Sequence, residues 1–206
     1  MEPSSKDWQY LLLLLAIGIG YNWQKFGLAY AYGFRGLGEL HNNPVYEMSY
    51  AYPEMAADYK FLSGLAVLLP TAILGIFMGN ITDNTNRVKL VGIASVLWSM
   101  TTFLSGYIDS FEVFSVMRVL LGVFTAACIP PAVSLIRDYF PPSYRSQANS
   151  IFLASDYIGC CISSLSILFI KNFGWREDYE ITGLFGILAG VATLAYLQEP
   201  VRGKWE

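Results

Sequence analysis

Six apolar blocks divide this chain, and each is close to the ~20 residues that cross a lipid bilayer as a helix. They lie near residues 8–30, 61–79, 88–107, 111–140, 148–170 and 181–197. Backbone N–H and C=O groups in hydrocarbon have to pair internally, so each block should be helical. Only 14% of the residues are charged, whereas a soluble domain carries about a quarter. The pattern predicts an all-α, multi-pass membrane protein with one six-helix bundle over residues 1–206.

Two of these blocks have features of their own. The fourth block contains Pro130 and Pro131, which lack a backbone donor and clash with the preceding turn, so we expect a bend there. The first block resembles a secretory signal, with Lys6, an apolar run over 11–19 and then Ala29-Tyr30-Ala31. Its apolar run is longer than a usual signal core, and we therefore expect a retained span.

The distribution of basic residues predicts the orientation. With the N-terminus inside, seven basic residues fall in inner segments and four in outer loops, which places both termini in the cytoplasm, or in the matrix of a mitochondrion. The inner ones are Lys6, Arg87, Lys89, Arg137, Arg145, Arg202 and Lys204, and the outer ones are Arg35, Lys60, Lys171 and Arg176. The outer loops are also acidic, Asp178 included, and no basic face suggests nucleic acid as a partner.

The connection over residues 31–60 is the longest in the chain and holds five tyrosines. Long loops in compact proteins are uncommon and often functional. Tyrosine also favours the membrane interface, because its ring is apolar and its hydroxyl is polar. We expect an interfacial helix or a cap here, and a partner-binding surface is the alternative.

Residues for catalysis or metal binding do not form a recognisable set. Cys128, Cys160 and Cys161 fall inside spans without a metal-binding spacing, and His41 lies in a loop. Neither a nucleophile–base set nor a phosphate-cradling loop is evident. We therefore expect no enzymatic activity, no metal and no cofactor.

A short polar turn separates the second and third blocks. It contains Gly79, Asp83, Arg87 and Lys89, and it resembles the loop between the second and third helices of major facilitator superfamily transporters. In that family the aspartate caps a helix and pairs with arginine, which locks one conformation of the two halves. The resemblance implies that Gly79 permits close helix approach and that Arg87 and Lys89 are basic partners of Asp83. The alternative is an ordinary polar turn.

Other segments carry the same resemblance. They are Arg118 to Gly122, which matches the family pattern Arg-x-x-x-Gly, then 137–148, 174–176, and finally 199–203 and 21–26, which are similar to the spinster-like branch. The resemblance implies half of a transporter, because the family fold has two six-helix bundles, each an inverted pair of three-helix repeats.

Two positions depart from the spinster-like pattern. That branch carries an acidic residue followed by arginine in its first helix, where this chain has Gln24 and Lys25. Glutamine cannot exchange a proton near neutral pH. Phe124 and Thr125 replace a glycine and a glutamate after the Arg-x-x-x-Gly pattern. Two proton-handling carboxylates of the branch are therefore missing.

The resemblance also implies a solute site near the midplane, between the two bundles. The polar residues that could line this half are Tyr21, Gln24, Lys25, Arg118, Asp156 and Tyr157. Arg118 and Asp156 fall at similar depths, which predicts an ion pair, because a charge in a membrane usually has a partner. Backbone carbonyls or water are the alternative partners.

Two functions remain open at this point. The first is transport of a small organic or amphiphilic solute by alternating access, with lysophospholipids as the class that the resemblance implies. Transport would need a second six-helix half, supplied by a homodimer, by a separate chain, or by a longer parent protein of which this sequence is a fragment. The second is a non-transporting accessory subunit, derived from a carrier half, in a larger membrane complex such as one of the mitochondrial inner membrane.

Overall fold

The computed structural model describes residues 3–205, so residues 1–2 and 206 of the predicted bundle lie outside the described part. Every regular element in this part is helical. The long helices are α1 (Ser5–Gly33), α4 (Ala66–Asn84), α5 (Arg87–Ser105), α6 (Phe111–Thr125), α7 (Ile129–Tyr139), α8 (Pro142–Asn172) and α9 (Trp175–Tyr196). The short ones are η1 (Gly38–Leu40), α2 (Met48–Ala51), α3 (Met55–Lys60) and the π-helical η2 (Phe61–Leu65).

These helices form six segments that are long and apolar enough to cross a membrane. The predicted all-α, six-span fold is confirmed. The second segment, Met55–Asn84, joins α3, η2 and α4, and so begins earlier than the sequence suggested. The sixth begins at Trp175, because the first turn of α9 accommodates Glu177 and Asp178. Acidic side chains are favourable there, at the positive end of the helix dipole.

The predicted bend in the fourth span is confirmed. α6 ends at Thr125, a turn occupies 126–128, and α7 begins at Ile129. Pro130 and Pro131 stand in the first turn of α7, where a missing backbone donor is tolerated. The two prolines therefore restart the helix after the break.

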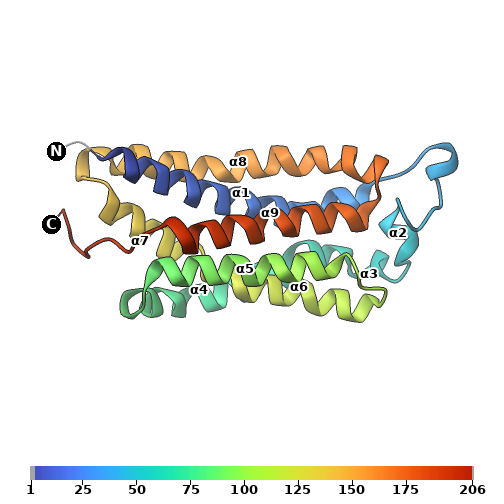
Figure 1. The fold of residues 1–206 in the computed structure, drawn as a ribbon. Coiled ribbons are helices and arrows are strands. Elements are labelled where there is room, and N and C mark those ends of the chain that lie inside the picture. The colour runs from blue at the N-terminus through green and yellow to red at the C-terminus, as the bar shows by residue number, and fades with distance from the viewer. Residues whose placement is uncertain (1–2, 206) are drawn as a thin grey trace.

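The helices run along one common direction in two layers (Figure 1). α1, α8 and α9 lie in one layer, and α4, α5 and α6 lie in the other, with both termini at the same end. Glycines allow the closest approach between the layers. A Cβ at Gly183 of α9 would come 2.6 Å from the backbone nitrogen of Phe103 on α5. Small residues at such crossings let membrane helices pack tightly.

α4 and α8 leave much of their apolar surface uncovered. In the most apolar 18-residue stretch of each span, 17% of the α4 span is buried and 28% of α8, whereas 61% of α1 is buried. Ile76 and Phe77 of α4 are exposed, and a Cβ at Gly75 or Gly79 would meet no atom within 4 Å. These faces are open to lipid or to another helical unit.

Residues 34–54 form a cap over the end of the bundle opposite both termini, which the basic residues predict to be the outer end (Figure 1). Met48, Tyr52 and Met55 are buried against the helices. The indole nitrogen of Trp175 donates to the carbonyl of Pro44 at 2.8 Å, and the Tyr52 hydroxyl donates to a carbonyl after α5, that of Ile108. The cap is thereby held to the start of α9 and to the loop between α5 and α6.

Candidate functional site

A groove between α1 and α8 brings together three of the predicted cavity residues, namely Lys25, Asp156 and Tyr157. Its volume is about 310 Å³. Asp156 and Tyr157 are exposed on α8, and Lys25 is half-buried on α1. The rest of the lining is Asn22, Phe26 and Cys160. The groove therefore offers one cation, one carboxylate and aromatic rings on one face of the bundle.

Close packing of α1 against α8 forms the floor of this groove. A Cβ at Gly159 would come 2.6 Å from Cβ of Asn22, and one at Gly18 would come 2.4 Å from Oγ of Ser155. At this distance the amide of Asn22 donates to Asp156 Oδ1 at 2.7 Å and to the Gly18 carbonyl at 3.0 Å. The Asn22 bond holds the Asp156 carboxyl at the edge of the groove.

Lys25 faces aromatic rings rather than a carboxylate. Its ammonium lies 5.1 Å from the ring centre of Phe26 and 5.7 Å from that of Tyr21, which are cation–π distances. The Asp156 carboxylate accepts a hydrogen bond from Asn22. Lys25 and Asp156 therefore do not form an ion pair with each other. Both remain available to a ligand.

Tyr21 lines a narrower cavity, of about 40 Å³, beside the same carboxyl of Asp156. Its ring is buried and meets that of Trp98 edge-on at 6.2 Å. The remaining lining includes Cys128, in the turn between α6 and α7. Tyr21 thus connects the groove with the bend of the fourth span.

Gln24 is not on the groove. It is 2% exposed and lies where α1 meets α5 and α9. Its amide nitrogen donates to Ser99 Oγ at 3.1 Å and to the Thr182 carbonyl at 3.2 Å, while its oxygen accepts from the Thr102 hydroxyl at 3.0 Å. A fully bonded amide at this position ties three helices together.

Arg118 is also buried, and the predicted ion pair with Asp156 is wrong. The guanidinium of Arg118 donates to the backbone carbonyls of Gln24 at 3.3 Å and Lys25 at 3.5 Å. Asp156 is bonded to Asn22 instead. α1 therefore supplies the partners of both charges, and sequence depth alone could not show that it does. The Nε atom of Arg118 has no partner among the described residues.

Arg87 stands at the centre of a buried network at the inner end. Its guanidinium is 2.6 Å from Asp138 Oδ2 and 2.7 Å from Glu199 Oε1, and it donates to the Ser134 hydroxyl at 2.9 Å. The second oxygen of Glu199 accepts from the backbone nitrogen of Val88 at 3.1 Å. The network joins α5, α7 and the segment after α9.

The other residues of the predicted conformational lock are placed differently from what the resemblance implied. Asp83 is exposed and lines an inner groove with Arg137 and Arg145, so Arg87 is not its partner. Lys89 is exposed, and its backbone nitrogen is capped by Asn86 Oδ1 at 2.8 Å. Within the described residues no helix approaches Gly79. The implied Arg87–Asp83 pairing is thus replaced by the pairing with Asp138 and Glu199.

The segment after α9 completes this inner end. Arg202 donates to the carbonyls of Thr82, Asp83 and Thr85. Carbonyls at the C-terminal end of a helix lack partners within the helix, and Arg202 satisfies those of α4. Asp138, Glu199 and Arg202 were missed as network members, although their segments carried the family resemblance. The sequence does not show which helix ends lie next to one another in the folded bundle.

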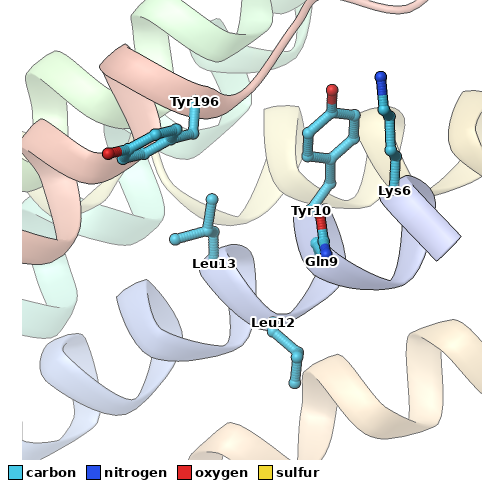
Figure 2. A pocket seen from close by; sticks show the side chains of 6 residues that line it. All are labelled: Lys6, Gln9, Tyr10, Leu12, Leu13 and Tyr196. Atoms are coloured by element: carbon cyan, nitrogen blue, oxygen red, sulfur yellow. The ribbon is translucent and has the colours of Figure 1, made fainter.

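A second groove lies at the inner end of α1, beside α9 (Figure 2). Lys6 and Tyr10 project side by side from α1, and Leu13 points toward Tyr196 of α9. Tyrosine and lysine beside leucine are typical of the membrane interface. No buried polar group lines this groove, so it is a weaker candidate for a solute site than the α1–α8 groove.

Comparison with known proteins bears on this arrangement. The family model for the Major Facilitator Superfamily matches residues 12–206. The chain belongs to the major facilitator superfamily. Its members are transporters rather than enzymes. The matched region includes the groove, both buried arginines and the inner-end network.

Spinster proteins are among the superfamily members that this chain resembles. It is 27% identical over 158 residues to protein spinster of Drosophila melanogaster, covering 72% of this chain and 26% of that protein. It is 29% identical over 164 residues to protein spinster homolog 1 of Bos taurus, covering 75% and 31%.

The fold of one solved superfamily member is also similar. A bacterial homolog of the human lysosomal transporter spinster, in an inward-facing and unoccupied conformation, superimposes with a TM-score of 0.74 at 22% identity. The match covers 97% of this chain and 45% of that one. The chain thus spans less than half the length of the relatives and of the solved structure that it matches.

Proposed function

We propose that this chain is one half of a transporter that moves a small organic or amphiphilic solute by alternating access. The α1–α8 groove is the observation that carries the proposal. Lys25 and Asp156 present opposite charges there without pairing with each other. A headgroup with both charges would find a counter-charge for each, and the aromatic rings beside Lys25 suit an apolar neighbour.

A second six-helix half is part of this proposal. The match to less than half of a solved superfamily chain supports it. So do the uncovered faces of α4 and α8, which expose apolar side chains and small residues of the kind found at contacts between membrane helices. A second copy of this chain and a separate chain are both compatible with these faces, and the mass of the detergent-extracted particle separates them.

Uptake of a fluorescently labelled lysophospholipid into liposomes containing the protein tests the proposal. Lys25→Gln and Asp156→Asn should each reduce uptake at least tenfold, the effect of losing one charge-assisted contact of about 1.4 kcal/mol or more. Asparagine can still accept from Asn22, so Asp156→Asn keeps the groove closed at its floor. Lys171→Gln, at the exposed end of α8, is the matched control.

Uptake that persists unchanged in both groove variants would refute the assignment of the groove. No uptake by the wild-type protein, together with its purification inside a large complex, would instead favour the accessory-subunit function.

A further inference from the structure

Asp178 is a buried carboxylate that the sequence pattern assigned to an outer loop. The structure places it inside the first turn of α9, with 2% of its surface exposed. Its Oδ1 atom has no hydrogen-bond partner among the described residues. A buried carboxylate oxygen without a partner is costly, and this one lies outside both the groove and the inner-end network.

The surroundings of Asp178 are hydrogen-bonding but not cationic. The indole nitrogen of Trp23 on α1 donates to Ser166 Oγ on α8 at 2.8 Å, and the Ser166 hydroxyl lies beside the Asp178 carboxyl. Tyr179, next along α9, is buried, and its hydroxyl has no partner within residues 3–205. Arg118, the buried cation of this region, directs its bonds to carbonyls of α1.

The other buried carboxylates of the described residues all have partners. Asp7 accepts from the backbone nitrogen of Ser4 at 2.8 Å, and Glu47 accepts from that of Gly36 at 2.7 Å. Asp138 is paired with Arg87. Asp178 differs from all three, because neither a cation nor a backbone N–H bonds its side chain in the described part of the chain.

Two effects act on the charge of such a group in opposite directions. The N-terminus of α9 favours a negative charge by about 0.3–1 kcal/mol, and by ~2 kcal/mol in favourable buried geometries. Removing an unpaired carboxylate from water costs several kcal/mol. The second effect is larger, so the neutral acid is the form that this environment accommodates. A neutral acid can also donate a hydrogen bond, which a carboxylate cannot.

We propose that Asp178, together with Ser166 and Trp23, forms a proton-binding site in the outer half of the bundle. The carboxylate takes one proton from outer water when the site is hydrated and holds it as a carboxylic acid when the helices close. Coupling of this proton to solute movement rests on the proposed transport function, whereas the site itself does not.

Infrared spectroscopy of the whole protein in liposomes tests the site without any uptake measurement. Near neutral pH the wild-type protein should show a protonated-carboxyl C=O band that disappears at alkaline pH. Asp178→Asn should remove this band, and Asp109→Asn, on the exposed loop between α5 and α6, should leave it intact. Failure of uptake with the band present would refute the transport function alone.

A band unchanged in Asp178→Asn, or no band in the wild-type protein, would overturn the proposal. If Asp178→Asn does not fold, as judged by its elution from a sizing column, Ser166→Ala is the substitute. Losing the hydroxyl should shift the frequency of the band, because the polar neighbour of the acid is removed. An unshifted band in Ser166→Ala would equally overturn the site.

Discussion

Arg87 and Arg118 are two buried arginines, each 2% exposed on a membrane-spanning helix, and they differ in what they face. Arg87 meets two carboxylates and a hydroxyl at the inner end. Arg118 meets only backbone carbonyls of α1. Each guanidinium keeps one nitrogen without a partner among the described residues, Nη2 in Arg87 and Nε in Arg118, so the difference lies in the partners. Burial alone therefore does not distinguish a structural charge from one that is available for another role.

The difference follows from where each helix ends. The inner end gathers the start of α5, the end of α7 and the segment after α9, so acidic residues from two of them reach Arg87. Arg118 lies two turns into α6, beside the middle of α1, where each backbone carbonyl already serves its own helix. A guanidinium that bonds only backbone carbonyls can exchange partners when helices move, whereas one held by two carboxylates resists such movement.

The largest effect should come from Arg87→Ala. Removing one partner of a buried ion pair leaves uncompensated charge and typically costs about 3–5 kcal/mol. The free energy of unfolding in detergent, measured by denaturant titration, should fall by that amount. Lys89→Ala, two residues along the same helix but exposed, is the control and should change it little. Equal effects of the two substitutions would remove the structural distinction between the arginines.

A smaller effect on stability is expected for Arg118→Met. No carboxylate is left unpaired by this change, and an apolar side chain of similar length replaces a guanidinium that bonds only backbone carbonyls. The unfolding free energy should therefore change by less than ~2 kcal/mol. Liposome uptake should nevertheless be lost. A loss of stability as large as that in Arg87→Ala would show that Arg118 is structural as well.

The smallest effect is expected at Glu47, a buried charge in the outer cap. Burial raises its pKa, but the Gly36 backbone hydrogen bond and His41, whose Nδ1 is 3.2 Å away, outweigh this and lower the pKa below its usual value. A lowered folded pKa contributes stability above the unfolded value of about 4.3. That stability is lost as pH falls through the folded pKa.

The protection of the cap over residues 36–47, measured as the ratio of the intrinsic to the observed exchange rate of its backbone amides at each pH, should therefore fall in acid and not in base. Glu47→Gln should remove most of this pH dependence, because glutamine has no proton to gain. Persistence of the acid effect in Glu47→Gln would assign it to another group. That result would show that the Gly36 backbone hydrogen bond to Glu47 does not stabilise the cap.

Much of the fold could be predicted from apolar length alone. The six spans and the interruption at Pro130 follow from rules that act within a single helix. The ends of spans were less predictable, because the sequence assigned Asp178 to a loop on account of its charge. A helix N-terminus can hold such a residue, and only the placement of Gly174 and Trp175 showed where α9 begins.

The candidate site was predictable as a set of residues but not as a set of contacts. Lys25, Asp156 and Tyr157 share a groove, whereas Gln24 is bonded between helices and Arg118 points elsewhere. Which face of α1 each residue occupies depends on the packing of α8 and α9 around it. Spacing along one helix carries no information about that packing.

By itself the sequence determined that the chain crosses a membrane six times, because hydrocarbon requires helices and helices require apolar length. It also contained the inner-end motif that resembles the superfamily. Only the tertiary structure decided that Arg87 pairs with Asp138 and Glu199, that Asp156 bonds Asn22, and that Asp178 is buried without a cation. Such pairings join residues far apart in the chain, and the crossing of helices sets their distances.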